Sequence, residues 1–255
     1  MNIHTFKNYK YDTNDLFFDK PCEVKGVTLY PIKTKDYENF LGYAQYLMFS
    51  KKHLGLDKVK DVDLLNGLIF LMANTRGNSE EDIGTVLIEM SNLFRLLTHK
   101  EIKSITTDKG FEFVDEEETL RINKDNFNTI RKVALKMSLL TEPKIYDSEL
   151  DRKWAEKARI AHQNGKPLEL GEIVLVVSQD MKFTVEQTLD LNIFQLNSYY
   201  MRIMQVYECE TTRLFATVSP DCKPTPFAKS IFDELYRDHD DDYNIKSSDF
   251  EKMLK

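Results

Sequence analysis

Glycine and proline are both scarce in this sequence: its 255 residues include only nine glycines and seven prolines. These residues supply most tight turns and helix ends, so their scarcity argues against a β-sandwich built from many short strands. Large side chains are abundant instead, with 16 phenylalanines and 12 tyrosines, and 42% of the chain is hydrophobic. A chain of this length and composition can bury a sizeable core. The composition therefore predicts long helices.

Disulfide, secretion and membrane signals are also lacking. The three cysteines, Cys22, Cys209 and Cys222, are an odd number at long spacings, which does not fit a secreted disulfide framework. The first residues are polar and contain no apolar segment typical of a signal peptide. The longest apolar stretch, Leu68–Ala73, is far too short to cross a bilayer. We expect a cytoplasmic protein that has no membrane partner.

Basic charge is in deficit, since 35 lysines and arginines face 42 acidic residues and give a net charge of -7. Proteins that neutralise nucleic-acid phosphates need a surplus of Lys and Arg on one face. The basic runs here are short, as in Lys51-Lys52 and Arg131-Lys132. The sequence therefore disfavours a nucleic-acid partner.

Motifs that bind nucleotides or metals, or that position a catalytic nucleophile, are missing as well. The glycines are scattered singly and form neither GxGxxG nor GxxxxGK[ST], the patterns that cradle phosphates. The Cys and His residues make no close ligand pairs of the kind that structural zinc needs, and neither HExxH nor GxSxG occurs. We expect no cofactor, no metal ion and no catalytic residue, and hence a protein that is not an enzyme.

Two acidic segments leave alternatives open. The turn Asp115–Glu118 offers hard oxygen ligands for a cation, although a solvated hairpin loop is the favoured interpretation. Near the end of the chain, Asp240, Asp242, Asn244 and Glu251 have the spacing of EF-hand ligands. Ile245 stands where that loop requires glycine, so an acidic flexible tail is the better interpretation.

Apolar periodicity predicts the secondary structure. Side chains recur at helical spacing over residues 34–48, 61–73, 79–97, 123–142, 148–162, 168–177, 189–207 and 227–236. Thr34 is a candidate cap for the first helix, and Ser79 with Asp82 resembles a capping box for the third. Leu16–Asp19 and Cys22–Ile32 are predicted to form a short antiparallel pair, although their apolar residues do not alternate cleanly. A change of period predicts a hairpin within 101–122, with glycine at its turn and a third strand at its end.

These elements predict an α+β fold that is mainly α-helical, with a helical core and a small antiparallel β element. The polar stretch around Tyr146 is the best internal boundary. We therefore expect an N-terminal α+β domain over 1–145, a C-terminal helical domain over 146–237, and an acidic flexible tail over 238–255.

Three aromatic residues in the C-terminal half are candidates for binding a partner: Trp154, Tyr199 and Phe194. Trp154 is the sole tryptophan and lies in a segment rich in charge, where an aromatic residue can anchor an interface. It can equally dock its own helix onto the rest of the domain. Tyr199 and Tyr200 are adjacent, so one ring is expected in the core and the other at the surface.

Several stretches, in the same order along most of the chain, resemble a family of tail-assembly and virion-associated proteins from phages and prophages of low-GC Gram-positive bacteria. They are FDKP at Phe18–Pro21, VTLYPIKTKDY at Val27–Tyr37, INKDNF at Ile122–Phe127, and LNIFQL at Leu191–Leu196 before a long helix. The resemblance implies a protein made in the infected cytoplasm that contacts tail or baseplate proteins and uses no cofactor. It implies no catalytic residue.

The first functional hypothesis is accordingly a non-enzymatic phage protein that binds other proteins, as a transient chaperone of tail assembly or as a minor virion component. A homo-oligomer is compatible with it. The second is an enzyme, a hydrolase or nuclease, with dispersed carboxylates such as Asp115 or Glu117. The third is an acidic inhibitor or immunity-type regulator of a basic partner, for which the net charge is the support.

Overall fold

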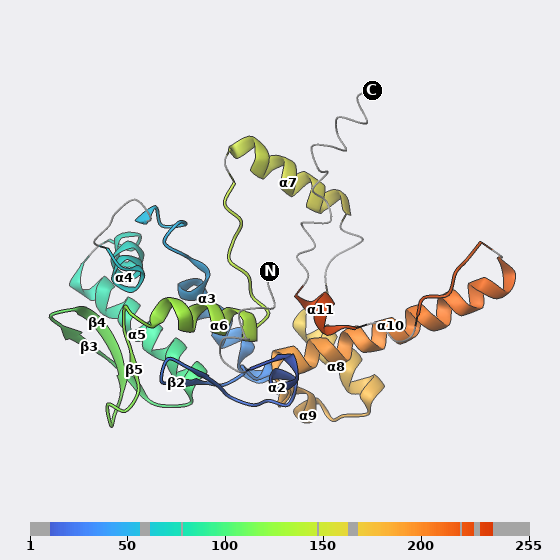
Figure 1. The fold of residues 1–255 in the computed structure, drawn as a ribbon, viewed down its shortest axis with the longest axis horizontal. Coiled ribbons are helices and arrows are strands. Elements are labelled where there is room, and N and C mark those ends of the chain that lie inside the picture. Colours follow the sequence, from blue (N-terminus) through green and yellow to red (C-terminus); the bar gives the residue numbers. More distant parts are fainter. Residues whose placement is uncertain are drawn as a thin grey trace.

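The computed structural model describes residues 11–56, 62–77, 79–146, 148–162, 168–219, 221–226 and 230–236. These residues form a mainly helical body with two small antiparallel sheets (Figure 1). The helices are α2 (Thr13–Phe17), α3 (Tyr37–Met48), α4 (Leu64–Asn74), α5 (Glu80–Thr98), α6 (Phe127–Met137), α7 (Glu149–His162), α8 (Leu170–Met181), α9 (Val185–Leu189), α10 (Ile193–Val218) and α11 (Phe232–Leu235). The predicted α+β class is confirmed.

The N-terminal segment differs from the prediction in one element. Leu16–Asp19 was predicted as a strand, but Leu16 lies in α2 because the Asp12 side chain accepts hydrogen bonds from the Asn14 and Asp15 amides and caps the helix. The strand pair itself is a short hairpin, β1 (Cys22–Val24) and β2 (Val27–Leu29). Gly26 sits at its turn with φ of +80°, a conformation that favours glycine.

Helices α3 to α6 and both sheets enclose the main core. The capping box at the start of α5 is confirmed, with Ser79 and Asp82 bonded reciprocally. The predicted cap of α3 is wrong: Thr34 starts a 3₁₀ turn over Thr34–Asp36, and its hydroxyl donates to the Leu191 carbonyl, 157 residues away. Helix α6 ends at Met137, well before Pro143, and Leu139 follows it with φ of +56°.

The predicted hairpin within 101–122 is confirmed as a three-stranded antiparallel sheet. Its strands are β3 (Ile102–Thr107), β4 (Gly110–Asp115) and β5 (Arg121–Ile122), in the order β3-β4-β5. Phe113 of β4 faces Ile122 of β5, and its ring packs edge-on against Phe94 of α5 at 4.9 Å. This contact fastens the sheet to the central helix.

The C-terminal half builds a second, smaller core between α8 and the first part of α10. Helix α10 is longer than the predicted 189–207 and projects far from the body (Figure 1). The division into domains at 145/146 and the flexible tail stay predictions, and residues 237–255, with the EF-hand-like spacing at 240–251, lie outside the described residues. Across the described part, every helix is either too short or too polar to pass through a bilayer.

Candidate functional site

Phe194, one of the three aromatic candidates, is a core residue. Its side chain is fully buried, and its ring packs against Phe232 at 5.3 Å and Tyr236 at 5.9 Å. The prediction that Phe194 contacts a partner therefore does not fit its position, because no part of the side chain reaches the surface. The periodicity of α10 placed it correctly on the helix but could not show that α11 would cover it.

Tyr199 is half-buried, and its ring packs against other aromatic rings of the same chain. Its ring lies 5.8 Å from Phe17 of α2 and 5.9 Å from Phe183, which precedes α9. Tyr200 is likewise half-buried, so the expected split between one core ring and one surface ring is not found. Tyr199 therefore connects α10 to the N-terminal segment.

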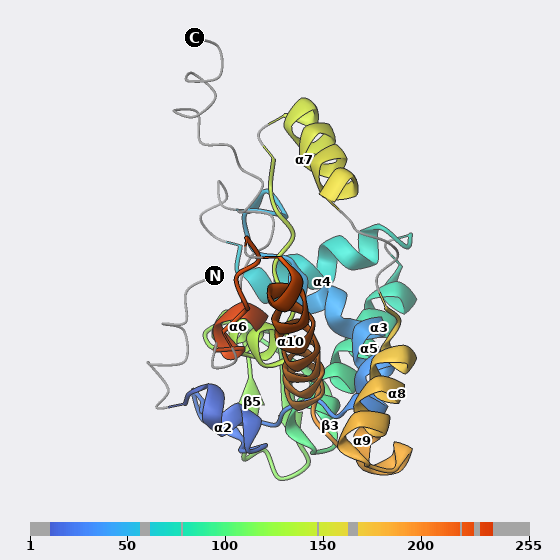
Figure 2. The ribbon, with the colours of Figure 1, turned by 90° about the vertical axis from the view of Figure 1, so that its right-hand side faces the viewer.

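Trp154 is different, since 64% of its surface is exposed on α7. The helix begins where the Ser148 hydroxyl accepts from the Asp151 amide. Leu150, one turn earlier on the same face, is also 64% exposed, and the Lys157 ammonium lies 5.6 Å from the centre of the Trp154 ring. The interpretation that this ring docks α7 onto its own domain is therefore contradicted: Figures 1 and 2 show α7 standing apart from the helical body.

The distal half of α10 is a second surface rich in exposed apolar side chains, and most of it lies beyond residue 207, where the predicted helix ended. These side chains are Met204, Tyr207, Leu214, Phe215 and Val218, which are 47%, 50%, 71%, 59% and 79% exposed. In the first half of the helix the same face is covered, because Leu196 and Ile203 pack against Val174 and Val177 of α8. Tyr207 still contacts α8, because its hydroxyl donates to the Asp180 carboxylate at 2.9 Å, and the apolar stripe continues past this point.

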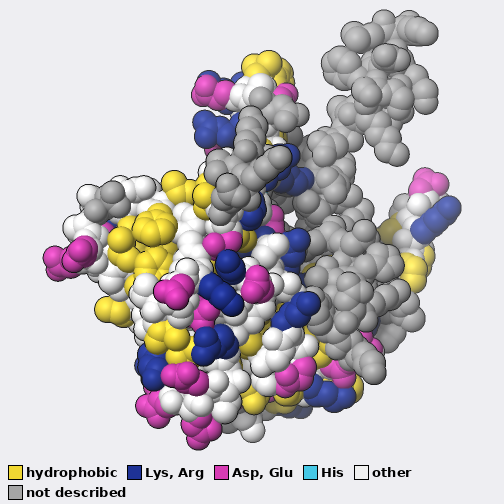
Figure 3. All heavy atoms as spheres, turned by 60° about the vertical axis from the view of Figure 1, so that its left-hand side comes forward, with side chains coloured by type: hydrophobic (Ala, Val, Ile, Leu, Met, Phe, Trp, Pro, Cys, Tyr) yellow, Lys and Arg dark blue, Asp and Glu magenta, His cyan; other side chains and the backbone are white. Residues whose placement is uncertain are grey.

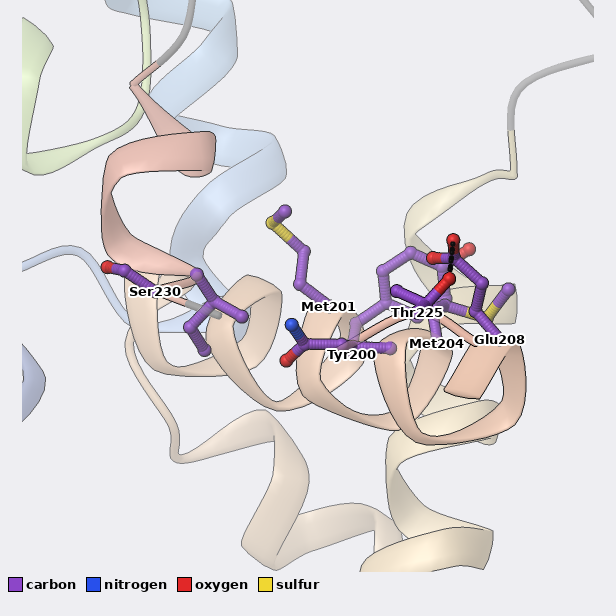
Figure 4. Close-up of a pocket in the computed structure, with 8 residues that line it drawn as sticks. Tyr200, Met201, Met204, Glu208, Thr225 and Ser230 are labelled. Atoms are coloured by element: carbon purple, nitrogen blue, oxygen red, sulfur yellow. Dashed lines mark hydrogen bonds between the residues drawn. The ribbon is translucent and has the colours of Figure 1, made fainter. Parts of the chain in front are cut away.

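A groove of about 270 Å³ runs beside this stripe, between α10 and the chain that leads to α11 (Figure 4). Met201 and Met204 line it from α10, and Ile231 lines it from the far side. The Thr225 hydroxyl donates to the Glu208 carboxylate at 3.1 Å and closes one end, as the dashed line shows. The groove is therefore an apolar recess with a single charged group at its rim.

The chain that returns along α10 covers the opposite side of the helix. The Thr225 amide donates to the Thr212 hydroxyl at 2.9 Å, and the Cys222 thiol donates to the Thr212 carbonyl at 3.6 Å. Cys209 is buried on this side. One side of the distal helix is thus occupied within the chain, and the apolar stripe is left on the other.

A third apolar area lies on α4 and the adjoining hairpin. Phe70 of α4 is 47% exposed, and its ring lies 5.8 Å from Phe111 of β4. Figure 3 shows hydrophobic side chains gathered at the level of α4, with acidic and basic groups interspersed over the rest of that face.

The acidic turn after β4 is a structural cap. The side chain of Asp115 is nearly buried and accepts from the Lys100 ammonium at 2.6 Å, from the Leu120 amide at 2.8 Å and from the Thr119 hydroxyl at 2.7 Å. The hydrogen bond from Lys100 is the largest cause that holds the pKa of Asp115 well below its usual range, followed by those from Leu120 and Thr119. In this structure its carboxylate oxygens are engaged in bonds within the chain.

This cap makes the turn sensitive to acid. Because the folded pKa of Asp115 lies below its ordinary value of 3.8, its contribution to stability is complete above about pH 5 and is lost as pH falls through the ordinary value towards the folded one. We expect the melting temperature of Asp115→Asn to fall less between about pH 5 and pH 2 than that of the wild type. Glu117→Gln, an exposed acid of the same turn, is the control and should follow the wild type; parallel curves for all three proteins would refute the assignment.

Among the residues that the structure describes, no group of three or more His, Cys, Asp or Glu side chains is placed to hold a metal ion. The described cysteines are all free: Cys22 and Cys209 are buried and Cys222 is half-buried.

Over 249 residues, 93% of this chain and 95% of the relative, the sequence is 25% identical to the SPbeta prophage-derived uncharacterized protein YomV of Bacillus subtilis (strain 168). No protein-family model matches the chain, and no solved structure matches it significantly. A prophage-derived protein therefore stands among the relatives of this chain, and the match extends over nearly all of both sequences.

Proposed function

We propose that this chain is a non-enzymatic phage or prophage protein that binds a tail or baseplate protein, during tail assembly or as a minor component of the virion. Two observations support the proposal: the similarity to a prophage-derived protein along almost the whole chain, and the helix α7, which stands apart from the body (Figure 1) and exposes Trp154 and Leu150. The exposed Trp154 is the single observation that carries the binding role.

The chemistry of α7 suits insertion into an apolar groove of a partner. Trp154 and Leu150 are one helical turn apart and form the anchor of an amphipathic face. Around them, Glu149 bonds to Lys153 at 3.3 Å, so the rim is charged and partly self-neutralised. A buried tryptophan within a charged rim is the usual composition of an interface hot spot.

Replacing Trp154 by alanine should weaken binding to the tail or baseplate partner by about 2 kcal/mol or more, roughly a thirtyfold rise in Kd. The melting temperature should not change, because the ring is largely exposed. Each tail and baseplate protein of a prophage that encodes this chain is coexpressed with it in turn, and the Kd of any complex is measured with purified proteins. Ile88→Ala is the matched control, since Ile88 is 63% exposed on α5.

The sole tryptophan also supplies a direct probe. With 5-fluorotryptophan incorporated in this chain alone, the single ¹⁹F resonance should shift when the partner binds. A complex that forms without a shift and is insensitive to Trp154→Ala would rule out α7 while leaving the binding role intact. If no tail or baseplate protein binds, the proposed function itself fails.

The two forms of the proposal differ in where the protein ends up. An assembly chaperone should co-purify with its partner and be missing from finished particles, whereas a virion component should be found in them. Mass spectrometry of purified particles after induction of the prophage separates the two.

A further inference from the structure

The exposed stripe on the distal half of α10 has the spacing of a coiled-coil seam. Going along the helix, the residues on this face are Met204, Tyr207, Thr211, Leu214 and Val218, separated alternately by three and four positions. That alternation keeps one side of a helix facing a partner helix. The adjoining α8–α10 contact shows that the same face already packs against a helix where α8 reaches it.

This stripe is also close to symmetric about Thr211. Tyr207 and Leu214 lie four and three positions on either side of it, and Met204 and Val218 lie seven positions on either side. If a second copy of the helix is laid antiparallel with Thr211 at the crossing point, Val218 of one copy lies opposite Met204 of the other. A closed two-fold contact requires one patch to complement itself in this way.

The stripe is bordered by an exposed aromatic ring, that of Phe215, and by the groove beside α10. Phe215, 59% exposed, lies on the edge of the stripe that adjoins the groove lined by Met201, Met204 and Glu208. In the antiparallel arrangement, Phe215 lies opposite Tyr207 of the other copy, next to Glu208 at the rim of that groove. Two rings and two grooves would then be matched across the axis.

We propose that two copies of this chain pair antiparallel through the distal halves of α10, with Thr211 at the two-fold axis and Phe215 of each copy against the Glu208 end of the groove of the other. The five exposed apolar side chains offer roughly 600 Å² per copy, compared with about 800 Å² per partner in a standard interface. The dimer is therefore reversible and depends on concentration. This pairing uses α10 and not α7, so it stands or falls independently of the proposed function.

The charges beside the stripe set how this dimer responds to salt. Glu210 is exposed on the flank of the stripe, and at the axis it comes close to Glu210 of the second copy. The contact between like charges opposes association and is screened by salt. Dimerisation consequently strengthens with ionic strength and in Glu210→Gln, whereas binding of a basic partner helix at this face would weaken under both changes.

Sedimentation velocity of the full chain, from low to high micromolar concentration, tests the pairing. The wild type should pass from monomer to dimer, Glu210→Gln should dimerise at lower concentration, and Leu214→Glu should raise the dimer Kd by at least about tenfold, since it places a charge in the apolar contact. Ile88→Glu, an equally exposed site on α5, should behave as the wild type. A wild type that stays monomeric throughout, or a dimer indifferent to Leu214→Glu, overturns the proposal.

Cysteine cross-linking tests the direction. Thr211→Cys should form an intermolecular disulfide under mild oxidation, because the two positions meet at the axis. Val218→Cys should not, since its two copies would lie on the order of 20 Å apart along the antiparallel helices. The unmodified chain, whose Cys22 and Cys209 are buried, controls for the native thiols. Cross-linking through both positions would indicate parallel helices and refute the arrangement, as would cross-linking through neither.

Discussion

Replacing Arg131 by methionine is expected to lower the free energy of unfolding by about 3–5 kcal/mol, because the Leu47 carbonyl and the Glu142 carboxylate both lose their buried donor. The side chain of Arg131 has no exposed surface. One guanidinium nitrogen donates to the Leu47 carbonyl at 2.7 Å, and another bonds to the Glu142 carboxylate. The residue therefore ties α6 to the end of α3 and to the segment that follows α6.

The loss in the free energy of unfolding should be smaller when Glu142 is replaced than when Arg131 is replaced. Glu142→Gln should cost less, about 1–3 kcal/mol, because the glutamine carbonyl oxygen can still accept from Arg131 and the buried guanidinium keeps its bonds to Leu47 and Asn128. Urea denaturation of both variants and of Arg131→Met/Glu142→Gln completes a double-mutant cycle, in which the double variant should be less destabilised than the sum of the two single ones. If Arg131→Met alone loses less than about 1 kcal/mol, the buried guanidinium does not hold these segments together.

Arg131 also shows where prediction from the sequence ends. In the sequence it stands out only as part of a short basic run with Lys132. Asn128, three residues earlier, is a local partner, but Leu47 and Glu142 are 84 and 11 residues away, and no local pattern connects them to Arg131. By contrast, α5 and the β3–β4 hairpin were predicted well because their signals are local: a capping box, an apolar stripe of helical period and a glycine turn.

The surfaces that carry the proposals were predictable only in part. Trp154 was singled out from the composition of its segment, since an aromatic residue in a charged helix is unusual. For α10, periodicity predicted a helix over 189–207, yet it could not tell the covered part of its apolar face from the exposed part. Which part is covered depends on where α8 ends, and that is a property of the tertiary structure.

Asn192 is the second position where one side chain should have a large effect. It is fully buried at the start of α10, where its Oδ1 accepts from the Gln195 amide and caps the helix. Its Nδ2 donates to the Leu16 carbonyl at 3.0 Å and to the Asp19 carboxylate at 2.8 Å. One amide group thus begins the longest described helix and joins it to the N-terminal segment.

Alanine at this position should lower the free energy of unfolding by about 2–4 kcal/mol, from the lost cap and from the polar groups left without a partner in the interior. Asn192→Asp separates the two roles, because aspartate still caps α10 but cannot donate and brings a second carboxylate towards Asp19. In Asn192→Asp, the Gln195 amide should therefore stay protected from hydrogen exchange as in the wild type, while the α2 amides exchange faster. In Asn192→Ala, both the Gln195 amide and the α2 amides should exchange faster. Equal protection of α2 in all three proteins would mean that backbone contacts alone, such as the Ile193 amide donating to the Ile32 carbonyl at 3.0 Å, hold the two parts together.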